Sequence, residues 1–80
     1  MTKKPASEEA VKLGIAIQKF RIEKRFTQEE FADRVGNDRS YQGEIERGEA
    51  SVSFWKICQM AKRMELSTSE FIKKLEDHGF

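Results

Sequence analysis

Side chains that form several directional hydrogen bonds are concentrated between Asp38 and Arg47, whereas groups suited to catalysis stand alone. This segment reads DRSYQGEIER and combines arginines with carboxylates. The chain has one histidine, His78, and one cysteine, Cys58, and it lacks a Gly-rich phosphate loop. A metal-ligand cluster or a nucleophile with its base is therefore not available. The residue types favour recognition by hydrogen bonding over catalysis and imply neither a metal nor another cofactor.

The segment lies within FTQEEFADRVGNDRSYQGEIERG, which predicts two short helices joined by a tight turn. Thr27 and Glu30 have the spacing of a capping box, so a helix is expected over 28–35. Gly36 suits the end of that helix, because glycine readily adopts positive φ. Asp38 is a suitable cap for a second helix over 39–47. Helix, turn and helix is an arrangement that can place a second helix in the major groove of DNA.

At these residues the sequence resembles the helix-turn-helix of phage repressors and Cro proteins, the XRE-like family. Within it, the chain is most similar to restriction–modification controller proteins. The motifs are TQEEFADRVG followed by DRSYxxxIERG, and the resemblance extends from about Leu13 to Leu75. Its anchors are Leu13, Ile17, Arg21, Gln28, Ala32, Gly36, Ile45, Glu46 and Gly48. The resemblance implies an all-α, five-helix, lambda-repressor-like DNA-binding domain.

The resemblance also implies a role for individual residues. Those expected to meet base edges are Arg39, Ser40 and Glu44, with arginine suited to guanine and glutamate to cytosine. The resemblance assigns a phosphate contact to Gln28, and the side-chain chemistry and position of Tyr41, Arg47 and Ser51 lead us to expect the same of them. Each of the four also has a plainer interpretation: a good helix former, a filler between helices, an arginine favoured by the helix dipole, and a loop residue.

Arg21 and Glu46 are expected to form a structural ion pair between the first helix and the end of the recognition helix. The alternative is an ordinary exposed arginine. Two positions depart from the family pattern, because Asn37 and Gln42 stand where apolar residues usually pack the turn and the recognition helix. Buried amides are costly unless they are hydrogen-bonded. Arg25 and Glu65 similarly replace common glycines.

The rest of the chain is expected to support this motif within one domain over 7–80, preceded by a flexible arm over 1–6. Further helices are predicted over 7–24, 54–64 and 68–77 from capping residues and apolar periodicity. Eighty residues give only a small core, so a dimer would help to bury more surface. A symmetric interface is expected at Trp55, Ile72 and Leu75, and packing within one subunit is the alternative.

Charge composition alone does not indicate a nucleic-acid partner. The chain has 15 basic and 14 acidic residues, a formal net charge of +1, and no basic run. The prediction of DNA binding therefore rests on the motif, and any positive surface must come from folding.

The sequence predicts a homodimeric transcriptional regulator that binds palindromic operators in double-stranded DNA, without enzymatic activity. RNA polymerase is a further candidate partner, through Glu29, Glu30 and Asp33. A single cysteine fits the reducing cytoplasm, and no apolar run is long enough to span a membrane. The alternatives are a phage-type repressor or antitoxin of the same fold, or a helix-turn-helix used only for protein–protein contact.

Overall fold

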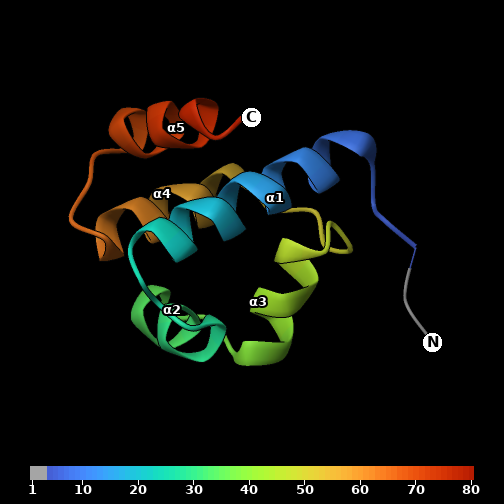
Figure 1. Cartoon of the computed structure of the whole chain (residues 1–80), viewed down its shortest axis with the longest axis horizontal. Coiled ribbons are helices and arrows are strands. Elements are labelled where there is room, and N and C mark those ends of the chain that lie inside the picture. The colour runs from blue at the N-terminus through green and yellow to red at the C-terminus, as the bar shows by residue number, and fades with distance from the viewer. Residues whose placement is uncertain (1–3) are drawn as a thin grey trace.

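The computed structural model describes residues 4–80, and these fold into five helices joined by short loops (Figure 1). The helices are α1 (Glu8–Glu23), α2 (Gln28–Val35), α3 (Arg39–Glu46), α4 (Phe54–Arg63) and α5 (Thr68–Asp77). No strand occurs within the described range. The predicted all-α fold is therefore confirmed. The bounds of α2 and α5 match the predicted ranges, whereas α1, α3 and α4 are slightly shorter because the predicted end residues are caps.

Local capping explains where α2 and α5 begin. Thr27 Oγ1 accepts a hydrogen bond from Glu30 N at 3.1 Å, and Thr27 N donates to Glu30 Oε1 at 2.9 Å. Ser67 and Glu70 form the same reciprocal pair at the start of α5. Both carboxylates accept from backbone N–H groups, which stabilises their charged form and lowers the pKa of Glu30 and of Glu70 below the ordinary value of 4.5.

The loops before α2 and α5 also share one backbone conformation. Arg25 and Glu65 have φ values of 63° and 59°, in the left-handed region that favours glycine. Each follows the end of a helix, and the next residue closes the turn with a bond from its N–H to a carbonyl five residues back. This geometry is the physical reason why glycine suits these two positions.

The core is centred on Phe20 of α1, which lies between α2 and α5. Its ring meets Phe31 at a centroid distance of 6.2 Å and Phe71 at 5.2 Å, both edge to face. Leu75 is part of this core and only 1% exposed. The prediction that Leu75 forms a subunit interface is therefore wrong, because its side chain is already buried within one chain.

The amino-terminal part of the chain packs directly on the end of α3. A Cβ at Gly14 would lie 2.8 Å from the carbonyl oxygen of Glu46, and one at Gly48, where φ is +74°, would lie 2.7 Å from Val11 Cα. Glycine therefore permits the close approach of the two backbones. Ala6 N donates to Gly48 O at 2.8 Å, so the expected flexible arm is held at Ala6. Residues 1–3 of that predicted arm lie outside the described residues.

Two aromatic side chains at the start of α4 remain outside the core. Trp55 is 80% exposed and Phe54 is 62% exposed, with their rings edge to face at 6.4 Å. The inward face of α4 is instead formed by Ile57, Met60 and Ala61.

Candidate nucleic-acid interface

The outer face of α3 and the first turn of α2 enclose one open hollow of about 430 Å³. Its lining consists of Gln28, Arg39, Ser40, Gly43, Glu44 and Arg47. Five of these six residues were expected from the sequence to contact DNA, and folding brings them together although Gln28 lies on a different helix. The hollow combines guanidinium donors, a hydroxyl, an amide and a carboxylate, which are the groups that read base edges and phosphates.

Gly43 is the residue of this hollow that the sequence reasoning missed. A Cβ at this position would lie 2.9 Å from Arg47 Nη1 and 3.5 Å from Gln28 Oε1. Its missing side chain therefore leaves room for the Arg47 guanidinium to lie over the helix. The sequence did contain a signal for this residue. Glycine inside a helix costs about 1 kcal/mol relative to alanine, which indicates that a side chain at this position would collide with a neighbour.

Arg47 is held in place by Glu49. Arg47 Nε and Nη2 each donate to a different oxygen of the Glu49 carboxylate at 3.0 Å. These hydrogen bonds raise the pKa of the Arg47 guanidinium above its ordinary value, so the group stays cationic. The Glu49 side chain is only 6% exposed, whereas that of Arg47 is 55% exposed. A largely covered carboxylate thus orients a guanidinium that solvent and ligands can reach.

The start of α3 leaves Arg39 and Ser40 exposed. Asp38 Oδ1 accepts a hydrogen bond from Tyr41 N at 2.8 Å, so Asp38 serves as the N-cap. The Arg39 side chain forms no hydrogen bond or ion pair with any residue of the described range 4–80, and its five donors are available to a ligand.

Besides the phosphate contact expected for it, Gln28 forms a hydrogen bond within the protein. Its Nε2 donates to Glu46 Oε1 at 3.2 Å. An amide nitrogen carries two hydrogens, so one remains for a phosphate oxygen. The bond to Glu46 fixes the direction in which that second hydrogen points.

Tyr41 and Ser51 do not join the hollow. Tyr41 is half-buried and its ring lies under the Lys56 ammonium, 5.6 Å from Nζ to the ring centroid. Ser51 is exposed in the loop after α3 and lines a separate hollow together with Leu13 and Phe80. Their predicted phosphate contacts remain predictions.

The expected ion pair between Arg21 and Glu46 is present. Arg21 Nε and Nη2 donate to the two carboxylate oxygens at 2.9 and 3.0 Å, and Arg21 Nη1 donates to Phe26 O at 2.8 Å. The Glu46 side chain is 2% exposed and that of Arg21 is 11% exposed. This buried pair ties α1 to the end of α3.

Asn37 and Gln42, the two amides at usually apolar positions, continue from this ion pair as a hydrogen-bonded chain. Gln42 Nε2 donates to Glu46 Oε2 at 2.9 Å, Asn37 Nδ2 donates to Gln42 Oε1 at 2.8 Å, and Lys56 Nζ donates to Asn37 Oδ1 at 2.8 Å. We refer to Lys56, Asn37, Gln42, Glu46 and Arg21 as the side-chain network. Gln42 is fully buried, yet every buried side-chain polar atom in the described part of the chain has a partner.

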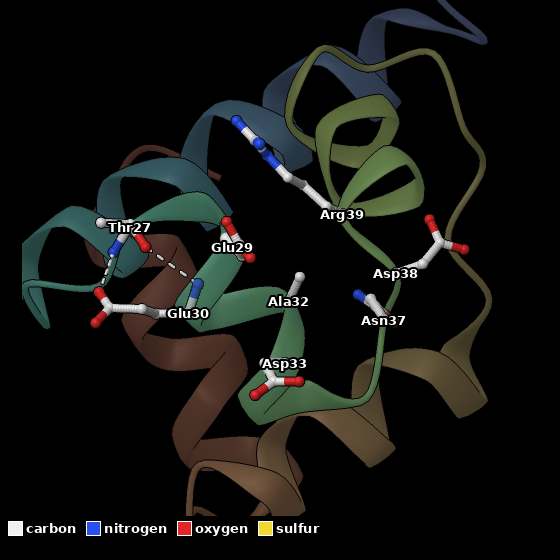
Figure 2. A pocket seen from close by; sticks show the side chains of 8 residues that line it. All are labelled: Thr27, Glu29, Glu30, Ala32, Asp33, Asn37, Asp38 and Arg39. Atoms are coloured by element: carbon white, nitrogen blue, oxygen red, sulfur yellow. Dashed lines mark hydrogen bonds between the residues drawn. The ribbon is translucent and has the colours of Figure 1, made fainter.

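A second hollow, of about 560 Å³, lies between α2 and the start of α3 and is strongly acidic (Figure 2). Glu29, Glu30 and Asp33 of α2 line this hollow, and Arg39 of α3 borders it. The dashed lines in Figure 2 show that Glu30 is engaged with Thr27. The carboxylates disfavour a phosphate here, so DNA is expected to contact the other hollow.

Comparison with known proteins identifies the family. Residues 17–71 match the family model HTH_3, described as helix-turn-helix. The chain belongs to this helix-turn-helix family. Since the match includes α2 and α3, the family assignment covers the candidate interface itself.

Solved structures extend the likeness over most of the chain. The restriction–modification controller protein C.AhdI from Aeromonas hydrophila shares 34% sequence identity and has a TM-score of 0.72, with 81% of this chain and 98% of that chain covered. The controller protein C.Esp1396I, solved as a tetramer in complex with its natural 35 base-pair operator, is 30% identical, with a TM-score of 0.76 and coverage of 90% and 95%. The predicted resemblance to controller proteins is therefore confirmed.

A regulator outside the controller group shows a similar fold. ClgR from Corynebacterium glutamicum, named as a clp gene regulator, is 25% identical, with a TM-score of 0.72 and coverage of 91% and 78%. No curated protein sequence gives a significant match. Within residues 4–80 there is no cluster of three or more potential metal ligands, and no helix there is long and apolar enough to cross a membrane.

Proposed function

We propose that this helix-turn-helix protein is a sequence-specific transcriptional regulator of the controller type, which binds operator DNA with α3 in the major groove. The carrying observation is the hollow in which Arg39, Ser40 and Glu44 of α3 lie beside Arg47 and Gln28. Base edges would be read by the first three residues and phosphates held by the last two. The protein acts by binding rather than catalysis, in the cytoplasm.

Arg39 provides the sharpest test of this function. The protein is titrated against DNA from immediately upstream of its own gene, with excess random competitor, by fluorescence anisotropy at two salt concentrations. We expect a salt-dependent complex that survives competitor. Arg39→Ala should lower affinity for that DNA about tenfold or more and leave affinity for random DNA nearly unchanged.

Arg63→Ala is the matched control, because Arg63 is an exposed arginine at the far end of α4. Its loss should change neither affinity appreciably. Equal losses on both DNAs with Arg39→Ala would place Arg39 among the phosphate contacts. Failure of the unmodified protein to bind any operator would favour the use of the fold for protein–protein contact.

We further propose that two copies bind together on a palindromic operator. The exposed pair Phe54 and Trp55 supports an interface near the start of α4, and Ile72 of α5 is partly exposed. Trp55→Glu should shift the protein from dimer to monomer in sedimentation equilibrium, because it places a charge in an apolar contact. Ile22→Glu on α1 is the control, since Ile22 is also exposed, at 58%. An unchanged dimer with Trp55→Glu would move the interface elsewhere.

The acidic side of α2 is our candidate for contact with RNA polymerase. Glu29 and Asp33 are exposed, whereas Glu30 is used in capping. A variant with both Glu29→Gln and Asp33→Asn should retain operator binding and lose activation of transcription in a purified system. Unchanged activation would remove this face from consideration.

A further inference from the structure

We propose that Lys56, acting through Asn37 and Gln42, fixes the position of α3 and thereby contributes to discrimination between DNA sequences. This inference rests on the proposed function. Lys56 is a positioning residue here: it lies on α4 outside the α3 hollow and reaches the recognition helix through the side-chain network.

The direction of every hydrogen bond in the network is determined by its two ends. An ammonium only donates, so Asn37 must present its oxygen to Lys56 and its nitrogen to Gln42. Glu46, when ionised, only accepts, so Gln42 must present its nitrogen to Glu46. The side-chain amides of Asn37 and Gln42 are consequently each restricted to one orientation. With both in that orientation, every hydrogen bond of the network has one donor and one acceptor.

Lys56 is itself held from three sides. Besides Asn37 it donates to Gln59 Oε1 at 3.2 Å, and it lies over the Tyr41 ring. Gln59 Nε2 in turn donates to Val35 O at 3.4 Å, at the end of α2. The ammonium therefore joins α4 to the turn and to the two helices that the turn connects.

The network crosses the inner face of the same helix that carries the candidate base contacts. Gln42 is completely buried, and Arg39 lies about one turn before it, exposed at the start of α3 and lining the hollow. Hydrogen bonds weaken steeply with misalignment, whereas the hydrophobic effect has no preferred direction. A hydrogen-bonded anchor at Gln42 should thus define where Arg39 and Glu44 meet the bases.

The test compares Lys56→Met with Lys62→Met, an exposed lysine of the same helix that the network does not include. The unmodified protein first enriches a duplex from a random-sequence pool. Affinities for this duplex and for an unselected duplex are then measured at two salt concentrations. We expect Lys56→Met to reduce the ratio of the two affinities about tenfold, with unselected binding changed less than about twofold, and Lys62→Met to leave the ratio unchanged.

A parallel loss of affinity for both duplexes, with a shallower salt dependence, would identify Lys56 as a phosphate contact and overturn the proposal. An unchanged ratio would overturn it as well. Failure to enrich any duplex would instead count against DNA recognition by this protein, and the network would then be tested without DNA.

That DNA-free measurement is amide NMR of Lys56→Met. The proposal expects shifts that extend along α3, including Gln42 and Glu46, with the amides of α5 unmoved. Shifts confined to α4 would contradict it, whether or not DNA binds.

A triple variant separates positioning from stability. Asn37→Leu with Gln42→Met and Lys56→Met replaces the polar chain by apolar groups of similar size, which is often neutral for stability. We expect its unfolding midpoint to recover relative to Lys56→Met, while the affinity ratio remains reduced. Recovery of the ratio together with the midpoint would show that the network only stabilises the fold.

Discussion

Arg21 and Glu46 are 25 residues apart in the chain, yet they form a bidentate ion pair with N···O distances of 2.9 and 3.0 Å. The carboxylate also accepts from Gln28 and Gln42, so each of its oxygens has two donors. Glu46 is thus the point at which α1, α2 and α3 are joined through side chains. A carboxylate with four donors cannot be removed without leaving a buried guanidinium and two amides short of partners.

Glu46→Ala should lower the free energy of unfolding by about 3–5 kcal/mol, because Arg21 would remain buried without its counter-charge. Urea unfolding followed by circular dichroism measures this. Glu76→Ala, at an exposed position of α5, is the control and should change stability by less than about 0.5 kcal/mol. A loss as small as that of the control would mean that water replaces Glu46 readily.

Leu75→Ala should cost about 2–5 kcal/mol through the cavity it leaves in the core, where Leu75 is 1% exposed. The loss should be independent of protein concentration, because the side chain packs within one chain. Thermal unfolding at several concentrations distinguishes this from an interface residue, whose effect would shrink on dilution because the unmodified protein then dissociates as well. Ile72→Ala, on the partly exposed face of α5, is the comparison and should cost less.

Acid should weaken the starts of α2 and α5. The pKa values of Glu30 and Glu70 are below 4.5 in the folded chain, chiefly because of hydrogen bonds from the backbone of Thr27 and Ser67. The unfolded chain therefore binds these protons more readily, and the contribution to stability present above about pH 4.5 is lost as the pH falls through the lower, folded values. A plot of melting temperature against pH measures this loss.

The variant with both Glu30→Gln and Glu70→Gln is the control for acid sensitivity. Glutamine can still accept the capping hydrogen bond but does not titrate in this range. Its melting temperature should decline less steeply below about pH 4.5 than that of the unmodified protein. Identical slopes would assign the acid sensitivity to other carboxylates.

Gly43→Ala should separate stability from DNA binding. Alanine favours the helix by about 1 kcal/mol over glycine, but its Cβ would approach Arg47 Nη1 to 2.9 Å and displace the guanidinium. We expect an unchanged or higher melting temperature together with weaker binding to operator DNA. Normal binding would show that Arg47 moves aside without consequence.

Glu49→Gln tests the same arrangement from the other side. It weakens the bidentate pair that orients Arg47 while leaving Gly43 intact. If orientation of Arg47 matters, operator affinity should fall here too, measured in the same anisotropy titration. Affinity equal to that of the unmodified protein would mean that Arg47 needs no intramolecular partner.

The helix starts and ends of this fold are encoded by interactions between neighbouring residues. The starts of α2, α3 and α5 were predictable because Thr27, Asp38 and Ser67 form hydrogen bonds three residues along the chain. Gly36 likewise marked the end of α2, where φ is +80°. Such interactions need only neighbouring residues, so their spacing in the sequence is sufficient evidence.

Which apolar and polar groups face inward depends on how the helices pack against one another. Phe54 and Leu75 are both apolar residues on amphipathic helices, yet one is 62% exposed and the other 1%, because the packing of α4 and α5 against the rest of the chain selects the buried face. Asn37 and Gln42 look like unfavourable buried amides in the sequence alone. The hydrogen-bond donor that completes their chain is Lys56, 19 residues beyond Asn37. A hydrogen bond between residues far apart in the chain forms only when the helices pack. Such bonds hold α3, and with it the candidate interface, in position.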